Sequence, residues 1–313
     1  MLGGHVIQRV AVIGAGTIGA SWATYFLARG LEVSAYDPRP DGEAFVHRFA
    51  DTAWPTLQTL GWITPGANEQ RLRFCREIGA ALEGAQFVQE SAPEDEGLKI
   101  ALFAEMDAAL SGDAVIASSS SGLLISRVTE KCRHPQRCVI GHPFNPPHLI
   151  PLVEVVGGAK TSPAAIETAM DFYRDIGKHP IHIKKEVRGH VANRLQAALW
   201  REAIHLVVEG VVSVADADAA IAYGPGLRWA LMGPHLIFHL AGGEGGMAHF
   251  MSHLGAGPFQ SWMDDLGAPR LTAPVQQTII EGVAAEAGSR SIADLQKWRD
   301  RKLIEILKAS ASL

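Results

Sequence analysis

The chain has 313 residues, 47% of them hydrophobic and 19% charged, which is typical of a folded globular protein and exceeds the usual size of one hydrophobic core. Its formal net charge of −5 and the lack of any run rich in lysine and arginine argue against a nucleic-acid partner, because phosphate binding requires clustered positive charge. Three cysteines without a CxxC pair, no apolar run of about 18 residues and no export leader together predict a cytoplasmic protein without disulfides, a metal site or a membrane span.

Short β-branched runs alternate with helical patterns over the first part of the chain, up to about residue 184. This alternation predicts an α/β fold of the Rossmann type, in which helices cover both faces of a mostly parallel, doubly wound sheet. The segment between Asp41 and Leu98 is longer than a simple crossover and is expected to hold an extra helical pair, turned around residues 61–66. The predicted strands lie at residues 10–13, 31–36, 87–88, 114–117, 138–140, 152–156 and 181–183.

Strand signals fade after Arg188, and helical spacing dominates the rest of the chain. No linker rich in proline or glycine separates the two parts. We therefore predict two closely packed domains, a Rossmann-type domain at residues 1–187 and an all-helical domain at residues 188–313.

A glycine-rich turn follows the first strand. The sequence GAGTIG at residues 14–19 opens a helical pattern that runs to Arg29, and this context makes a weak GxGxxG pattern specific for a dinucleotide. The first glycine permits the tight turn, the second lets a pyrophosphate approach, and the third lets the helix pack against the strand. Backbone N–H groups at the helix N-terminus then face the phosphates. The residues expected to bind the dinucleotide here are Gly14, Gly16, Thr17, Ile18 and Gly19.

Asp37 lies 18 residues after Gly19, at the end of the second predicted strand. A carboxylate at this position accepts hydrogen bonds from the ribose hydroxyls and repels a 2′-phosphate, which predicts NAD as the cofactor. Arg39 is close enough in sequence to contact a 2′-phosphate, so NADP is the alternative.

Polar residues follow two later strands, as the serine run at residues 118–121 and the sequence GHPFNPP at residues 141–147. Ligands bind at the carboxyl ends of parallel strands, and alcohol oxidation needs a base that titrates near neutral pH, which favours His142. Glu154 lies inside an otherwise apolar strand and therefore requires a close partner. Asn193 begins the helical domain. Each of these residues taken singly is equally compatible with a structural role.

Taken together, the motifs GAGTIG, ASSSSGL, GHPFNPP, PLVEVV and VANRL resemble, in this order, those of the 3-hydroxyacyl-CoA dehydrogenase superfamily over nearly the whole chain. The resemblance implies an NAD-dependent 3-hydroxy acid dehydrogenase that forms a homodimer. In it, His142 is the general base, Glu154 orients and supports the imidazolium, and Ser121 and Asn193 hydrogen-bond the substrate oxygen. The residues that the resemblance implies along the cofactor are Ser121, Asn145 at the nicotinamide carboxamide, Glu94 and Lys99.

The substrate separates the branches of this superfamily. Residues 41–98 carry four arginines and no lysine against ten acidic residues, a formal charge of −6, which opposes the phosphates of CoA. The later motifs resemble the branch of L-carnitine dehydrogenases, L-gulonate 3-dehydrogenases and lambda-crystallin, and most of all the carnitine dehydrogenases. The resemblance therefore implies L-carnitine as substrate, with L-gulonate or a 3-hydroxyacyl-CoA as alternatives. A non-catalytic role, as in some lambda-crystallin relatives, is disfavoured by the intact set of motif residues.

A trimethylammonium group donates no hydrogen bond and is best held by aromatic faces. The candidates are Phe144, which follows the predicted base closely, and Trp229, Phe238, Phe250 and Trp262 of the helical domain. The substrate carboxylate requires a cation, either Arg194 or Arg228, and the sequence does not choose between them. Core packing for the aromatic residues and surface salt bridges for the arginines are the structural alternatives.

Overall fold

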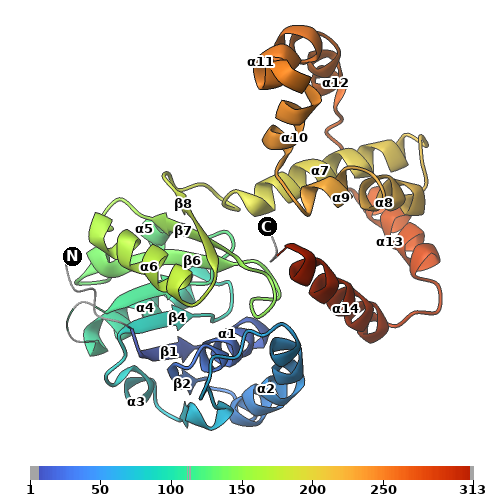
Figure 1. Cartoon of the computed structure of the whole chain (residues 1–313). Helices are drawn as coiled ribbons and strands as arrows, with labels where there is room; N and C mark the ends of the chain where they lie inside the picture. Colours follow the sequence, from blue (N-terminus) through green and yellow to red (C-terminus); the bar gives the residue numbers. More distant parts are fainter. Residues whose placement is uncertain (1–6, 111, 113, 311–313) are drawn as a thin grey trace. The chain divides into compact units, whose positions relative to one another are not determined.

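The computed structural model describes residues 7–110, 112 and 114–310, so the outer ends of both predicted domains, residues 1–6 and 311–313, lie outside it. The chain separates into two compact units, of which the first ends at Asn193 and the second begins at Arg194 (Figure 1). This division and the predicted boundary after residue 187 both lie near the start of helix α7 (Ala192–Val208). None of the helices over the described residues is long and apolar enough to cross a bilayer.

The first unit is built on a sheet of eight strands over the described residues, in the order β3-β2-β1-β4-β5-β6-β7-β8. Neighbouring strands are parallel except for β6 and β7, which run antiparallel. The predicted strands are all present, and the prediction of a mostly parallel, doubly wound sheet is confirmed. The strands are β1 (Arg9–Ile13), β2 (Glu32–Tyr36), β3 (Leu72–Cys75), β4 (Phe87–Glu90), β5 (Val115–Ser118), β6 (Cys138–Pro143), β7 (Leu152–Gly157) and β8 (His179–Ile183).

The segment between residues 41 and 98 differs from its prediction in the second half. Helix α2 (Gly42–Thr59) is the first of the two expected helices, and the turn follows it. After the turn, the chain forms a short 3-10 helix, η1 (Glu69–Arg71), and then the edge strand β3 instead of a second long helix. The strand was missed because it has only four residues and depends on pairing with β2, an interaction between distant segments.

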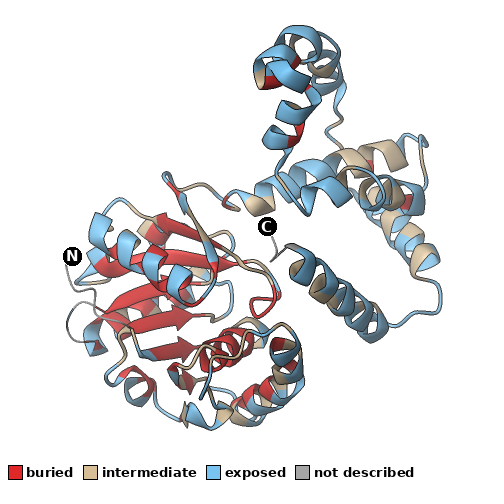
Figure 2. Cartoon of the chain, in the orientation of Figure 1, coloured by how far each residue is buried: buried red, intermediate tan, exposed pale blue. Residues whose placement is uncertain are grey.

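Alternate residues of the central strands face the two layers of helices, as the two-residue period of a strand requires. Val10 and Val12 of β1 belong to one buried cluster with α1, α2 and α6, whereas Ala11 and Ile13 belong to a second cluster with α3, α4 and α5. Both clusters are buried, as the red strands of Figure 2 show. The helices of this unit are α1 (Thr17–Ala28), α2, α3 (Ile78–Leu82), α4 (Glu96–Ala109), α5 (Ile125–Val128) and α6 (Pro163–Asp175), with a further 3-10 helix η2 (Pro135–Arg137).

The loops that carry the predicted site begin at one edge of the sheet, where β1, β4 and β5 end. Backbone hydrogen bonds continue the ladder into these loops, from Ser91 N to Ile13 O and from Ser119 N to Glu90 O, each at 2.7 Å. The rigid sheet therefore fixes the start of each loop, which is the usual position of ligands in open α/β sheets.

The second unit is helical, as predicted. Its elements continue from α7 with α8 (Val214–Ala222), α9 (Pro225–Trp229), α10 (Pro234–Ala241), η3 (Gly243–Gly245), α11 (Gly246–Phe250), the π-helix η4 (Met251–Phe259), α12 (Gln260–Asp265), α13 (Ala273–Ala287) and α14 (Ile292–Ser310).

Candidate functional site

The three glycines of the turn at residues 14–19 differ in what a Cβ atom would contact at each position. Gly14 has φ +92°, and a Cβ there would lie 2.7 Å from backbone atoms of Ser91 and Ala92. A Cβ on Gly19 would lie 1.8 Å from the carbonyl oxygen of Gly14, so only glycine lets α1 pack so closely. A Cβ on Gly16 would meet nothing within 4 Å. The turn thus leaves open space beside Gly16, where a ligand can approach the backbone.

The N-terminus of α1 adjoins this open space. Gly16 is its N-cap residue and supplies no side-chain hydrogen bond to the first turn. Thr17 is exposed and Ile18 is partly exposed. The first N–H groups of this helix of 12 residues are therefore available to an anion, which fits the pyrophosphate of a dinucleotide.

Asp37 follows β2 and is nearly buried, at 8% exposure. Its carboxylate accepts hydrogen bonds from Ala15 N at 2.7 Å and from Arg39 Nε at 2.8 Å. Burial alone would raise the pKa of Asp37, but the hydrogen bonds from Arg39 and Ala15 hold it below its ordinary value of 3.8. Asp37 is thus an ionised acceptor beside the glycine turn, and the guanidinium of Arg39 is engaged by that carboxylate.

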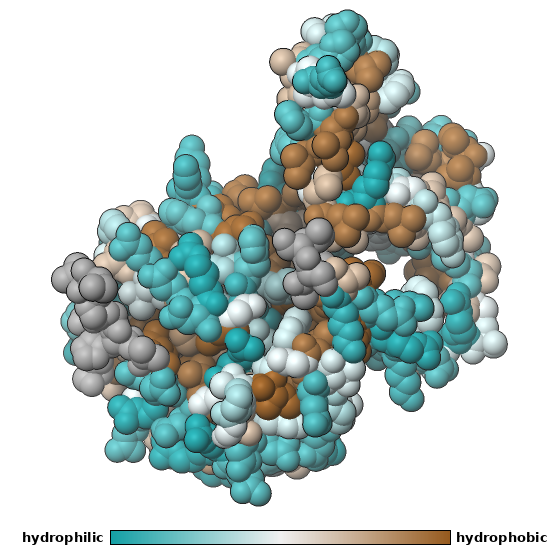
Figure 3. All heavy atoms as spheres, in the orientation of Figure 1, coloured by the Kyte–Doolittle hydropathy of each residue, from teal (hydrophilic) through white to brown (hydrophobic). Residues whose placement is uncertain are grey.

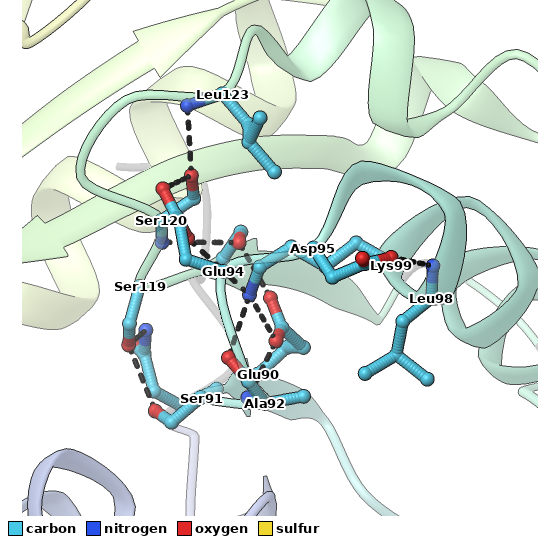
Figure 4. Close-up of polar contacts among 12 residues, drawn as sticks. Glu90, Ser91, Ala92, Glu94, Asp95, Leu98, Lys99, Ser119, Ser120 and Leu123 are labelled. Atoms are coloured by element: carbon cyan, nitrogen blue, oxygen red, sulfur yellow. Dashed lines mark hydrogen bonds and ion pairs between the residues drawn. The ribbon is translucent and has the colours of Figure 1, made fainter.

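The loops after β4 and β5 are joined by Glu94, whose Oε1 accepts hydrogen bonds from Ser120 Oγ at 2.7 Å, Ser121 N at 3.1 Å and Gly122 N at 3.0 Å. Lys99 on α4 is buried, at 1% exposure, and its Nζ lies 2.6 Å from Oε1 of Glu90 (Figure 4). Glu90 was missed from the sequence. It follows Gln89 at the end of a strand of four residues, so the argument from an otherwise apolar strand that selected Glu154 did not apply to it.

His142 and Glu154 lie directly opposite each other on the antiparallel strands β6 and β7. Nδ1 of His142 and Oε2 of Glu154 are 2.8 Å apart, and both side chains are buried. An ionised carboxylate only accepts hydrogen bonds, so Nδ1 carries the proton. The lone pair of the neutral imidazole is therefore on Nε2, where it can take a proton from a substrate.

The second oxygen of Glu154 holds the turn that precedes α7. Its Oε1 accepts hydrogen bonds from Val191 N at 2.8 Å and Ala192 N at 2.9 Å. Burial alone would raise the pKa of Glu154, but the hydrogen bonds from His142, Ala192 and Val191 lower it below its ordinary value of 4.5. Glu154 therefore has the close partner that a carboxylate within an apolar strand was expected to need. Its carboxylate is ionised at neutral pH.

Two further predicted residues are connected to this pair through the turn that precedes α7. Ser121 is exposed at the surface of the turn after β5. Asn193 is partly buried in the first turn of α7, and its Nδ2 lies 3.5 Å from the backbone oxygen of Ser121. Ser121, His142, Glu154 and Asn193, which are distant in sequence, are thus linked through one short chain of contacts.

The loop after β6 carries Phe144, which is partly buried, and Asn145, which is exposed. Lys178 anchors this loop because its buried Nζ donates hydrogen bonds to the backbone oxygens of Pro147 and Ile150. The same ammonium lies 3.7 Å from the centre of the Tyr25 ring on α1. Burial lowers the pKa of Lys178 well below its usual range.

Arg194, Arg228 and Trp229 belong to the second unit, where all three are exposed. Within the described residues, none of them has a partner in an ion pair or a cation–π contact.

His190 is a residue of the site that the sequence analysis missed. It has φ +48°, a left-handed conformation that costs a residue other than glycine about 1 kcal/mol. Its Nε2 donates to Ser120 O at 2.9 Å, its ring centre lies 5.2 Å from that of His142, and its buried Nδ1 has no partner among the described residues. His190 thus combines a strained backbone, a buried ring nitrogen without a hydrogen-bond partner in the described part of the chain and a contact with His142. Together these features indicate a functional position. Its only sequence signal was a histidine after a glycine.

Burial, with a smaller contribution from nearby His142, lowers the pKa of His190 below 6.5. Below pH 6.5 the unfolded chain therefore binds a proton at His190 more readily than the folded chain does. As a result, the free energy of unfolding is not reduced by His190 above pH 6.5, and it falls as the pH drops through the lowered pKa. We expect His190→Phe, which keeps a ring but cannot titrate, to show a flatter decline of unfolding free energy below that pH. Urea titrations of both proteins at several pH values measure this, and parallel declines would contradict it.

The comparisons with known proteins agree with this geometry. The family model of the 3-hydroxyacyl-CoA dehydrogenase NAD binding domain matches residues 9–187, and that of the C-terminal domain matches residues 189–280. The chain is 50% identical to an L-carnitine dehydrogenase of Streptomyces griseus over 98% of this chain and 91% of the relative. It is 47% identical to an L-carnitine dehydrogenase of Pseudomonas putida, over 98% and 95% of the two chains.

Solved structures are similar over most of the chain. An NAD+-dependent dismutase, 5-formyl-3-hydroxy-2-methylpyridine 4-carboxylic acid 5-dehydrogenase, is 32% identical with a TM-score of 0.82, over 97% of this chain and 99% of the other. FadB2 of M. tuberculosis is 28% identical with a TM-score of 0.67, over 88% and 95% of the two chains. The resemblance inferred from the sequence motifs is confirmed by these findings.

Proposed function

Because the chain belongs to the 3-hydroxyacyl-CoA dehydrogenase family, we propose that it oxidises the 3-hydroxyl group of L-carnitine to the 3-oxo acid, with NAD as cofactor and His142 as general base. The choice of substrate is supported by relatives that are named L-carnitine dehydrogenase and align over nearly the whole chain. The choice of chemistry is carried by one observation, the buried contact of 2.8 Å between His142 and Glu154.

NAD is the cofactor of this family's N-terminal domain, and the residues around the glycine turn fit it. We propose that the N–H groups at the start of α1 bind the pyrophosphate beside Gly16 and that Asp37 accepts hydrogen bonds from the ribose. In the same proposal, Asn145 binds the carboxamide of the nicotinamide, and Glu94 and Lys99 lie along the cofactor. When bound, NAD accepts the hydride that leaves the substrate carbon.

In the proposed reaction, Nε2 of His142 takes the proton of the substrate hydroxyl group. This transfer turns His142 into an imidazolium, and the ionised Glu154 stabilises that charge through Nδ1. Ser121 and Asn193 hydrogen-bond the substrate oxygen and hold it toward Nε2. The fixed tautomer of His142 means that no proton rearrangement precedes the chemistry.

The rest of the substrate needs an aromatic face and a cation. We propose that Phe144, with Trp229, contacts the trimethylammonium group, since each such contact contributes about 0.5 to 2 kcal/mol. The carboxylate is bound by Arg194 or Arg228, both exposed and without an ion-pair partner in the described part of the chain. In this proposal, residues 1–187 are the cofactor-binding domain and residues 188–313 are the helical substrate and dimerisation domain.

A panel assay of NAD reduction tests the substrate. We expect L-carnitine to give a kcat/KM at least about tenfold above L-gulonate and 3-hydroxybutyryl-CoA, a margin of roughly 1.4 kcal/mol. Residues 41–98, with their formal charge of −6, disfavour the phosphates of CoA.

The panel also includes the isosteric analogue of carnitine with a neutral tert-butyl group, which should be oxidised at least about tenfold less efficiently because the cation–π contribution is lost. Equal efficiency for carnitine and this analogue would contradict the proposed ammonium site.

We also propose that the second unit forms a homodimer. Within its described residues few large hydrophobic side chains are buried, namely Ile204, Val214, Ile237 and Phe250. Many others are exposed, and Figure 3 shows brown side chains over this unit. Apolar surface of this extent is typical of an obligate interface, and a second copy of the chain covers it by symmetry. Exposed examples include Leu199, Trp200, Leu236, Trp262 and Trp298.

A further inference from the structure

Glu90 and Lys99 form an ion pair in the interior of the first unit. Glu90 is the last residue of β4 and Lys99 lies on α4, and their side chains are 0% and 1% exposed. Nζ of Lys99 lies 2.6 Å from Oε1 of Glu90. Figure 4 shows the two side chains pointing toward each other. The proposed reaction uses neither charge. A buried charge is retained at high cost in free energy, so its position calls for a physical explanation.

Both members of the pair make further hydrogen bonds. Glu90 accepts from Ala92 N at 2.6 Å through Oε1 and from Ser118 Oγ at 2.5 Å through Oε2. Lys99 Nζ also donates to Ala92 O at 3.0 Å. Glu90 and Ser118 are register partners at the ends of β4 and β5. The pair therefore ties together the last residues of two strands, the loop between β4 and α4, and α4 itself.

Glu94 stands between this pair and the serine loop. Its Oε1 holds the turn at residues 120–122 through the three hydrogen bonds described above, whereas its Oε2 lies 3.9 Å from Nζ of Lys99. The side chain of Glu94 is 42% exposed and thus has room to move. Coulomb attraction draws this carboxylate toward the ammonium, and Glu90 opposes that attraction by neutralising Lys99 at the shorter distance.

We propose that Glu90 is a positioning residue: by neutralising Lys99, it leaves Glu94 on the turn at residues 120–122 and so fixes Ser121 next to Asn193. The inference rests on the proposed function, because it takes Ser121 as a residue that hydrogen-bonds the substrate oxygen. In this inference Lys99 acts on the turn through Glu90 and Glu94. The place along the cofactor that the sequence resemblance implies for Lys99 stays a separate proposal.

The first test is Glu90→Gln, which keeps size and hydrogen bonding but leaves the ammonium without its counter-charge. Glu94 then moves to Lys99, and the turn is released. We expect kcat with any hydroxy acid that the wild type oxidises to fall at least about tenfold. Use of any oxidised substrate keeps this test separate from the identity of the substrate.

Two backgrounds distinguish positioning from simple support of the fold. In Lys99→Met the competing cation is absent, so adding Glu90→Gln should lower kcat less than about threefold further. In Glu94→Ala the turn has already been released, so adding Glu90→Gln should again change kcat little. A purely structural ion pair would make Glu90→Gln and Lys99→Met lower kcat alike, in proportion to the loss of melting temperature, and would leave the effect in Glu94→Ala undiminished.

A crystal structure of Glu90→Gln supplies a readout that needs no activity. We expect Oε2 of Glu94 to lie within about 3.2 Å of Lys99 Nζ, as in a direct ion pair. Glu94 still bound to the turn would overturn the proposal. If Glu90→Gln does not fold, the double variant Glu90→Gln/Lys99→Met is compared with Lys99→Met alone. A tenfold difference in kcat between these two variants would also overturn the proposal.

Discussion

Replacing His142 by alanine is expected to lower kcat by about 100-fold or more, because general-base catalysis contributes on that scale. The binding of NADH should stay close to that of the wild type, since His142 lies on β6 whereas the glycine turn follows β1 and Asp37 follows β2. Steady-state NAD reduction measures the first quantity, and the quenching of protein fluorescence by NADH measures the second. The effect should therefore appear in kcat and not in cofactor affinity.

A second variant controls for the loss of packing. His142→Asn keeps a side-chain N–H that can donate to Glu154, so the carboxylate is not left without a partner, but it provides no base. We expect its kcat to be as low as that of His142→Ala, with a higher melting temperature. An asparagine variant that retained more than about a tenth of the wild-type kcat would show that another group takes the proton.

The pairing of His142 with Glu154 illustrates what a sequence can establish. A carboxylate within an apolar strand requires a partner on physical grounds, and β6 and β7 are joined by a connection short enough to make them neighbours. Antiparallel register then sets residue 142 opposite residue 154. The glycine turn and Asp37 were equally accessible, because their spacing along the chain reports the geometry of a single strand–helix–strand unit.

The parts that were missed depend on contacts between distant segments. Strand β3 exists only through its pairing with β2, and the left-handed conformation of His190 is fixed by the bond to Ser120 and by the fold around Glu154. Neither leaves a periodic or compositional mark in the sequence. Glu90 ends a strand of only four residues, of which Gln89 and Glu90 are polar, so the reasoning that selected Glu154 within an otherwise apolar strand does not select it. Its partner Lys99 lies nine residues away on α4.

Replacing Glu154 by glutamine should be the second severe change. The pKa of Glu154 is below its ordinary value, so in the wild type a full negative charge faces Nδ1 when His142 becomes an imidazolium. Glutamine removes that charge and sets its amide N–H₂ group against either His142 Nδ1–H or the N–H groups of Val191 and Ala192, all of which are donors. We expect kcat to fall by about 100-fold or more, with cofactor binding retained.

The pH dependence of the same variant separates an electrostatic role from a steric one. Without the carboxylate, protonated His142 loses stabilisation, so the acid limb of the kcat/KM profile should move to lower pH in Glu154→Gln. The depressed pKa of Glu154 also contributes folding stability that is present above pH 4.5 and is lost as the pH falls through the lowered value, and glutamine abolishes this dependence. Glu154→Asp keeps the charge at a shorter reach and should therefore restore part of kcat and return the acid limb toward that of the wild type. If the glutamine variant kept both the wild-type kcat and an unshifted acid limb, Glu154 would only orient the turn before α7, and the support of the imidazolium would have to come from another group.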